Sequence, residues 1–406
     1  MAGTLADANG HPHANGHAHA DPHPNASGTL EPVGPRTCRP HGTAAGGWRL
    51  VAGCGPSSSQ GPPDLRPEAP LPARGDEGSR FADMAQLRIR HLLVAGGAGF
   101  LGSAFVRDRL RADPEILITV LDALRRPTAA GDLADLLEDR RFRLVQGDVC
   151  DRSLVEDLAN RADATVNFAS EEFVGGSRAD APAFARTDVE GTANLLEAAR
   201  KFRHQRFLLA SSMEVYGPLK GAPYREDDAI APRTLPAAAR AAAGMLARVY
   251  HVMHDLPILI THGVATYGPT QPVDQPVARV ITAALRGVPV EVEADGSLVR
   301  DYLFVDDQAG AIARVLWKGD PGSTYNIGSG VQVSGSELAD MILRLCGKPP
   351  SLKRFVKEAP RWSYAIETRR MRPLGWEPRT TLSEGLRATV DWYRKNEAWW
   401  RDRQAA

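Results

Sequence analysis

The stretch "LLVAGGAGFLGSAFV", residues 92–106, joins an apolar run to a helical pattern through a short glycine-rich turn. Gly96, Gly99 and Gly102 have the spacing G-x-x-G-x-x-G, and Phe100 and Leu101 stand where the helix should begin. Glycines in such a turn let the backbone approach a pyrophosphate, which lies at the positive N-terminus of the helix. The stretch predicts a dinucleotide site that includes these five residues. The alternative is that the glycines serve strand–helix packing alone.

An acidic residue at the end of the next apolar run supports the dinucleotide interpretation. Asp122 lies near the end of "ITVLDAL", residues 118–124. A carboxylate in this position can accept hydrogen bonds from ribose hydroxyls, which favours NAD over NADP. Arg125 and Arg126 follow closely and could receive a 2′-phosphate, so the sequence leaves NADP open.

The pattern around this stretch predicts the fold class. From residue 88 onward, apolar runs such as "RFRLVQGDV" alternate with helical stretches such as "GTANLLEAARKF". Strands that alternate with helices predict an α/β fold with a parallel sheet and right-handed crossovers. We expect a Rossmann-type doubly wound parallel sheet that binds NAD over residues 85–264. The order is less regular afterwards, which predicts a smaller C-terminal α/β lobe over residues 265–403. This lobe should mainly bind substrate, with some segments returning to the Rossmann domain.

Residues 1–83 differ in composition from the rest of the chain. They hold 12 of the 30 prolines and 6 of the 11 histidines, without hydrophobic periodicity. Such a segment buries too little apolar surface to offset the entropy of ordering, so we expect a disordered Pro/His-rich extension. Met84 stands just before the first expected strand and would be a sensible start of translation.

Charge and cysteine usage exclude several classes of function. The formal net charge is zero, which gives no reason to expect nucleic acid or an anionic membrane as a partner. No run approaches the roughly 18 apolar residues of a membrane span. The four cysteines lack metal-ligand spacing. We therefore expect free thiols in a reducing cytoplasm and no metal site.

Further segments occur in the order typical of a known family. They are "QGDVCD" (146–151), "EVYG" (214–217), "YGP" (267–269), "VRDYLFVDD" (299–307) and "YNIGSG" (325–330). With the glycine turn, they resemble extended short-chain dehydrogenase/reductases of the NAD-dependent epimerase/dehydratase family, and most closely the dTDP-glucose 4,6-dehydratases. The resemblance covers about residues 87–403. It implies NAD as cofactor and a nucleotide diphosphate-sugar in the cleft between the lobes.

The resemblance also assigns roles to single residues. It implies that Asp148 and Val149 lie near the adenine and that Arg300 meets the diphosphate, although Arg300 could instead form a structural ion pair. Ser177, which ends "FVGGS", and Tyr267 of "YGP" are the other implied substrate contacts. The family forms dimers through two helices per subunit, at about residues 181–203 and 237–254 here. A homodimer is therefore expected, with a heteromer with an intact homologue as the alternative.

The chemistry of the family is altered in this chain. In the family, a tyrosine takes the proton of the sugar C4 hydroxyl while hydride passes to NAD. A lysine four residues later lowers the pKa of that tyrosine. Pro236 and Arg240 occupy these two positions. Proline has no titratable group but suits the first turn of a helix, so the segment predicts a helix without the usual catalytic pair.

The acid–base residues before "VYG" are altered as well. The family's Thr-Asp-Glu reads Ser212, Met213 and Glu214. Glu214 matches the base that removes the C5 proton, and Ser212 can replace the threonine hydroxyl. Met213 cannot protonate a departing hydroxyl. The candidate catalytic residues are therefore Glu214, Ser212 and Arg240.

Three functions remain open from the sequence. The first is a diverged enzyme for nucleotide sugars, in which Arg240 holds the ribose and Glu214, Tyr267 or His262 handles a proton. The second is a pseudoenzyme that acts as a partner or a ligand sensor. The third is an atypical NAD(P)H reductase of a substrate that is not a sugar.

Overall fold

The computed structural model describes residues 87–125, 131–171, 181–356 and 362–405. All of them belong to one compact unit, Arg74–Ala406. Some sequence-based predictions lie outside the described residues. These are the predictions for residues 1–83, Met84, Arg126 and Ser177.

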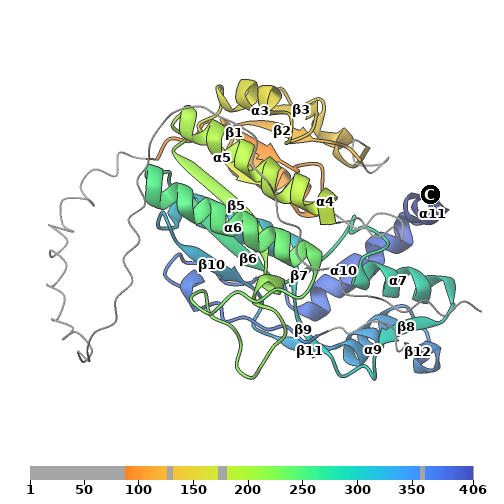
Figure 1. Ribbon diagram of the computed structural model, residues 1–406. Helices are drawn as coiled ribbons and strands as arrows, with labels where there is room; N and C mark the ends of the chain where they lie inside the picture. The colour runs from red at the N-terminus through yellow and green to blue at the C-terminus, as the bar shows by residue number, and fades with distance from the viewer. Residues whose placement is uncertain (1–86, 126–130, 172–180, 357–361, 406) are drawn as a thin grey trace, which may run out of the picture. The chain divides into compact units, whose positions relative to one another are not determined.

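A seven-stranded parallel sheet forms the centre of this unit (Figure 1). In spatial order its strands are β10 Thr324–Ile327, β6 Ile258–Gly263, β5 Arg206–Ser212, β4 Ala164–Asn167, β1 His91–Ala95, β2 Leu117–Asp122 and β3 Phe142–Gln146. The chain starts at β1, builds outward to β3, and then continues on the other side of β1 through β4, β5 and β6. This reversal creates the switch point where doubly wound sheets bind ligands. The predicted fold class is confirmed.

Helices cover both faces of the sheet because successive side chains of a strand point in opposite directions. Leu92 and Val94 of β1 pack in one core, whereas Leu93 and Ala95 pack in the other. The first core contains residues of α2 Phe100–Ala112 and α8 Val305–Lys318. The second contains residues of α3 Arg152–Ala159, α5 Gly191–Lys201 and α6 Leu235–His254, which Figure 1 shows in one layer. The burial of both faces explains why the strands read as continuous apolar runs.

Two smaller sheets and four helices form a third core toward the C-terminus. The sheets are β11 Gln332–Ser334, β9 Val299–Phe304 and β7 Ala265–Tyr267, and the pair β12 Lys353–Val356 and β8 Val290–Glu293. The helices are α7 Pro276–Arg286, α9 Gly335–Leu345, α10 Leu382–Lys395 and α11 Glu397–Ala405. β10 and α8 come from the same part of the chain but pack with the main sheet. The domain boundary at 264 and 265 stays a prediction.

Short helical segments complete the described chain. They are η1 Gly131–Leu136, α4 Ala181–Phe184, the π-helical η2 Ala185–Glu190, η3 Met213–Tyr216, η4 Pro350–Leu352 and η5 Arg369–Met371. No helix among the described residues is long and apolar enough to cross a membrane. The described residues also contain no group of three or more His, Cys, Asp or Glu side chains that could hold a metal ion.

Candidate functional site

The glycine turn between β1 and α2 combines two roles. A Cβ atom on Gly96 would lie 2.5 Å from the Ala169 nitrogen, and one on Gly102 would lie 2.4 Å from the Gly96 oxygen. These two glycines are therefore required for close backbone packing. Gly99 differs, because a Cβ there would meet only the Gly96 oxygen, at 3.3 Å, and its φ of −70° suits any residue. Packing alone does not explain Gly99, whereas the close approach of a ligand would.

The turn opens onto a cavity of about 140 Å³ at the carboxyl ends of β1 and β2. Its lining residues are Gly96, Ala98, Gly99, Phe100, Leu121, Asp122, Ala123, Arg125, Gly147, Asp148, Val149, Phe168, Ala169, Ser170, Glu171 and Thr187. Most of the predicted cofactor residues belong to this set. Leu101 and Gly102 do not line the cavity and lie in the first turn of α2.

Asp122 fixes the shape of the turn from the end of β2. One carboxylate oxygen accepts a hydrogen bond from the Ala98 N–H and the other from the Leu124 N–H, each at 2.9 Å. A carboxylate oxygen has two lone pairs, so each can accept a further hydrogen bond. The position of Asp122 is therefore compatible with the predicted contact to ribose hydroxyls.

An ion-pair network built around Arg125 lines part of the same cavity. Arg125 pairs with Glu171 and, at 3.3 Å, with Asp148, which also lies 3.8 Å from Arg186. Burial alone would raise the pKa of Asp148, but the Cys150 N–H and the two guanidinium groups outweigh it and lower that pKa. Two carboxylates share Arg125, which leaves little positive charge for a 2′-phosphate.

The residues that line this cavity suit the pyrophosphate and the adenosine ribose of an NAD molecule. The glycine backbone leaves space that a side chain would fill, and α2 presents its N-terminus to it. The first hydrogen bond of this helix runs from the Ser103 N–H to the Gly99 carbonyl, so the N–H groups of residues 100–102 have no acceptor within the helix. The carboxylate of Asp122 lies at the end of the neighbouring strand. Acidic side chains around Arg125 favour NAD over NADP.

The opposite end of the sheet edge is formed by β5, β6 and the start of α6. The Thr234 side chain caps α6 by accepting a hydrogen bond from the Ala237 N–H, at 3.3 Å. Pro236 is buried in the first turn, where its missing N–H removes no helical hydrogen bond. The structure therefore has a well-formed helix over Pro236 and Arg240, as the sequence predicts.

Asp188 is a buried acid that the sequence analysis missed. It lies in η2 with 2% of its surface exposed and accepts hydrogen bonds from the Ser170 hydroxyl at 2.7 Å and the Glu171 N–H at 2.9 Å. Burial raises its pKa, against the opposing effects of the Glu171 N–H, the charge of Arg240 and the Ser170 hydroxyl. Arg240 on α6 is therefore close enough to Asp188 for their charges to interact. No local pattern distinguishes this acid, because Glu190 and Glu197 occur in the same helical stretch, "RTDVEGTANLLEAAR".

Ser212 and Glu214 stand side by side where β5 enters η3. The Ser212 side chain accepts a hydrogen bond from the Glu214 N–H at 3.2 Å, and both residues are partly exposed. Met213 points the other way, with 4% of its surface exposed, and packs in the hydrophobic core. Methionine at this position therefore serves packing and offers no proton.

Tyr364 comes to this site from a distant segment and was also missed. It is 5% exposed, and burial together with the charge of Glu214 raises its pKa to about 12, although Arg300 acts in the opposite direction. Glu214 and Arg300 therefore each lie within electrostatic reach of Tyr364. The fold brings together two predicted site residues, one from η3 and one from β9.

Arg300 has an internal partner. Its guanidinium lies 3.3 Å from the Glu293 carboxylate, and the two side chains are only 16% and 14% exposed. Glu293 also lies 3.8 Å from Arg279. The structural ion pair that the sequence left open is present. A guanidinium has five N–H donors, so this pair leaves donors for a phosphate.

Tyr267 and His262 lie in the packed interior. Tyr267 is 1% exposed, and its hydroxyl donates to the Leu382 carbonyl at 3.3 Å. His262 is 3% exposed, and its Nδ1 lies 2.7 Å from the Tyr216 hydroxyl. Burial lowers the pKa of His262 to about 3 and raises that of Tyr267. Both side chains belong to the packed interior, and neither is retained here as a substrate contact or a proton carrier.

A doubly wound parallel sheet with a glycine turn, an acid after β2 and a cavity at the switch point defines a Rossmann-type dinucleotide-binding protein. Residues 92–328 match the model of the NAD dependent epimerase/dehydratase family. The chain belongs to this family. The predicted family and its cofactor, NAD, are thereby confirmed at the level of the family.

Known relatives agree with this assignment. The low-salt glycan biosynthesis protein Agl12 of Haloferax volcanii is 41% identical over 304 residues, which cover 74% of this chain and 98% of the relative. A dTDP-glucose 4,6-dehydratase of Streptomyces niveus is 39% identical over 316 residues, which cover 76% and 94%. The structure of DesIV, a dTDP-glucose 4,6-dehydratase from Streptomyces venezuelae with NAD and TYD bound, has a TM-score of 0.74 and 35% identity, and covers 77% and 99%.

Proposed function

We propose that this chain binds NAD(H) in the cavity beside the glycine turn and acts on a nucleotide diphosphate-sugar by an altered mechanism. The observation that carries the proposal is the contrast along one sheet edge. The glycine turn, α2 and Asp122 fit a dinucleotide, whereas the buried Pro236 replaces the usual tyrosine. Relatives of this family support the substrate class, because similar chains are dTDP-glucose 4,6-dehydratases.

The cofactor residues have distinct tasks in this proposal. The backbone from Gly96 to Gly102 receives the pyrophosphate at the start of α2. Asp122 accepts hydrogen bonds from the adenosine ribose, and Asp148 and Val149 border the adenine. When bound, NAD supplies a hydride acceptor at its nicotinamide ring.

The remaining site residues handle the sugar and its protons. Glu214 accepts a carbon-bound proton, and the Ser212 hydroxyl donates a hydrogen bond to the sugar oxygen beside it. Arg240, whose charge acts on Asp188, holds the nicotinamide ribose in place of the usual lysine. Arg300 meets the diphosphate with the donors that Glu293 leaves available.

Two measurements test this function separately. Calorimetric titration of the full chain with NADH tests the cofactor half, and saturable binding is expected. Incubation with NAD and single nucleotide diphosphate-sugars, followed by NADH absorbance and product chromatography, tests the catalytic half. Glu214→Gln should abolish any conversion, while Glu377→Gln, which changes a glutamate elsewhere in the chain, should not. Failure to bind NADH would overturn the proposal.

A second candidate is a catalytically inactive protein that binds the same ligands. The observation in its favour is that Pro236 and Met213 are both buried in the packed structure and offer no titratable group. In this case NADH binds, but no nucleotide sugar is converted, and the chain stabilises or regulates an intact homologue. Co-purification with an active family member, lost on substitution of the α6 surface, would favour this candidate.

We also propose that α6 forms a subunit interface. An exposed apolar stripe on this helix is defined by Leu235, Met245, Val249, Val252 and Met253, with exposed fractions from 48% to 80%. At about 100° per residue, these five positions fall within an arc of about 100° around the helix, which places them on one face. Light scattering should show a dimer that Val249→Glu and Val252→Glu together dissociate. Val331→Glu, at another exposed valine, should leave the dimer intact.

A further inference from the structure

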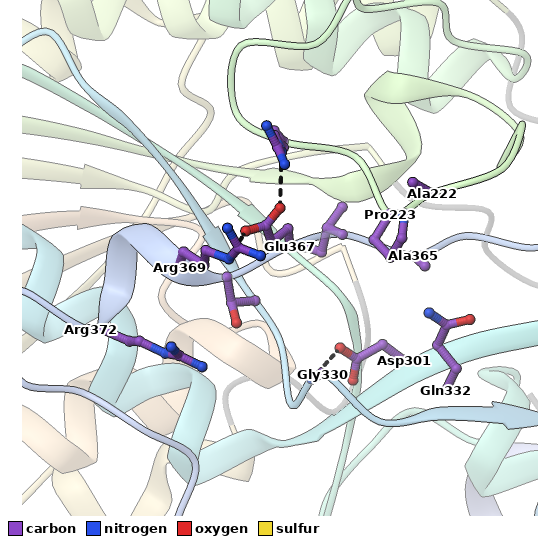
Figure 2. Close-up of a pocket in the computed structure, with 12 residues that line it drawn as sticks. Ala222, Pro223, Asp301, Gly330, Gln332, Ala365, Glu367, Arg369 and Arg372 are labelled. Atoms are coloured by element: carbon purple, nitrogen blue, oxygen red, sulfur yellow. Dashed lines mark hydrogen bonds and ion pairs between the residues drawn. The ribbon is translucent and has the colours of Figure 1, made fainter.

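A second cavity, of about 440 Å³, lies beside strand β9 (Figure 2). It is lined by Ala222, Pro223, Arg225, Asp301, Gly330, Gln332, Ala365, Ile366, Glu367, Thr368, Arg369 and Arg372. None of these residues lines the cavity beside the glycine turn. Asp301 borders it from β9, and the side chain of the preceding Arg300 points to the opposite face of that strand. The cavity is therefore separate from the proposed substrate site.

Two arginines of this cavity share a single carboxylate. Glu367 accepts from the Arg225 Nε–H at 3.0 Å through one oxygen and pairs with the Arg369 Nε through the other (Figure 2). Both arginines use only Nε in these contacts, and no contact within the described chain engages their terminal nitrogens. Their side chains are 66% and 73% exposed. One negative charge thus holds two guanidinium groups together and leaves their Nη donors available.

The other charged residues do not cancel this positive charge. Arg372 is exposed, and its side chain has no hydrogen bond or ion pair within the described part of the chain. Asp301 is 1% exposed, and its carboxylate accepts hydrogen bonds from the Ser329 and Gly330 N–H groups at 3.1 and 2.8 Å. Three arginines against two carboxylates leave a formal charge of 3 − 2 = +1. The unpaired Nη donors and the net positive charge therefore favour the binding of an anion.

The size and walls of the cavity indicate what kind of anion it takes. Small-molecule sites typically have volumes of roughly 300–1,000 Å³, a range that includes this cavity. Pro223, Ala365 and Ile366 supply an apolar wall beside the arginines. Guanidinium groups bind phosphate through paired N–H donors in a geometry that matches the phosphate oxygens.

We propose that this cavity binds a small phosphorylated metabolite. Its phosphate lies against the Nη donors of Arg225 and Arg369, with Arg372 adding a third positive charge. The rest of the molecule packs on Pro223, Ala365 and Ile366. Glu367 sets the spacing of the two guanidinium groups. This site is additional to the proposed function and does not depend on it.

The test uses inorganic phosphate and glycerol 3-phosphate as probes, with glycerol as the uncharged control. Calorimetry of the full chain is carried out with and without saturating NAD, because phosphate can also occupy the glycine turn. We expect binding of both probes, but not of glycerol, under either condition. The triple variant Arg225→Gln, Arg369→Gln, Arg372→Gln should weaken this binding at least about tenfold, or 1.4 kcal/mol.

A matched variant separates this site from general charge effects. Arg152→Gln, Arg200→Gln and Arg401→Gln together remove the same number of charges from exposed ion pairs elsewhere. This control should keep the affinity within about twofold. Equal weakening in both triple variants would overturn the proposal, as would unchanged affinity in the first triple variant or no measurable binding. These outcomes can still be measured if the chain does not bind NAD, because the site does not depend on the proposed function.

Discussion

The two sides of the sheet's carboxyl edge differ in whether backbone groups or side chains form the site. Beside β1 and β2, the glycine backbone and a helix N-terminus shape the cavity, and Asp122 fixes the turn through the backbone N–H groups of Ala98 and Leu124. Beside β5 and β6, the resemblance to the family implies a site made by side chains, and the residues that we align with it, Pro236 and Met213, are buried. The helix and strand remain intact on this side. A backbone function thus persists with the fold, whereas a side-chain function can be exchanged without disturbing it.

The largest expected effect is on catalysis. The natural chain should convert dTDP-glucose to the 4-keto-6-deoxy product at least about 10⁴-fold more slowly than an intact dehydratase. General acid–base catalysis contributes about 10²–10⁴-fold per proton transfer, and two transfers are affected here. The assay incubates the chain with dTDP-glucose and NAD beside an intact dehydratase. Turnover within tenfold of the control would show that another base takes the place of the tyrosine.

A pair of glycine variants tests the other side of the comparison. Gly99→Val should weaken NADH binding on the order of 100-fold, or about 2.7 kcal/mol, because its side chain enters the pyrophosphate space. The fold should tolerate this change, since Gly99 has an ordinary φ. Gly102→Val should instead destabilise the protein, because its Cβ meets the Gly96 oxygen at 2.4 Å. Calorimetry and urea unfolding measure the two effects, and unchanged affinity in Gly99→Val would refute the assignment.

The buried His262 should make the β6 side sensitive to acid. Its folded-state pKa of about 3 lies below the unfolded value of 6.5, so the unfolded chain binds the additional proton as the pH falls below 6.5. This group should therefore remove about 2 kcal/mol of unfolding free energy between pH 6.5 and pH 5. His262→Asn should lose this part of the pH dependence, while His254→Asn should retain it. Urea unfolding at pH 6.5 and pH 5 measures this change in unfolding free energy. The same decrease in wild type and in His262→Asn would contradict the low pKa of His262.

The smallest expected effect concerns Arg240. If the nicotinamide side is held only loosely, Arg240→Gln should weaken NADH binding by no more than about tenfold, or 1.4 kcal/mol. Arg248→Gln, farther along the same helix, serves as the matched control. Asp188→Asn should reduce the effect of Arg240→Gln, because the two charges interact. A loss as large as that of Gly99→Val would mean that both sides contribute equally to cofactor binding.

The sequence predicts the fold and the glycine turn because both depend on local patterns. Alternating apolar runs and helices determine a doubly wound sheet, and the glycine spacing marks its first turn. Two features depend on distant contacts and were missed or misplaced. Asp188 in a helical pattern resembles a surface acid, and its burial depends on Ser170 and Glu171. The hydroxyl of Tyr267 bonds to Leu382, 115 residues later, which no local pattern indicates.

The ion pair between Arg300 and Glu293 has a consequence for how a diphosphate can bind. Glu293 is a tethered competitor, an anion that the chain carries at a high effective concentration beside the guanidinium. A phosphate can use the guanidinium donors that Glu293 leaves free, but it shares the positive charge with this carboxylate, so it gains less than it would from an unpaired arginine. Because a tethered carboxylate cannot be diluted away, this reduction in affinity is the same at every protein concentration. The ion pair thereby moderates the affinity of Arg300 for a phosphate without preventing the contact.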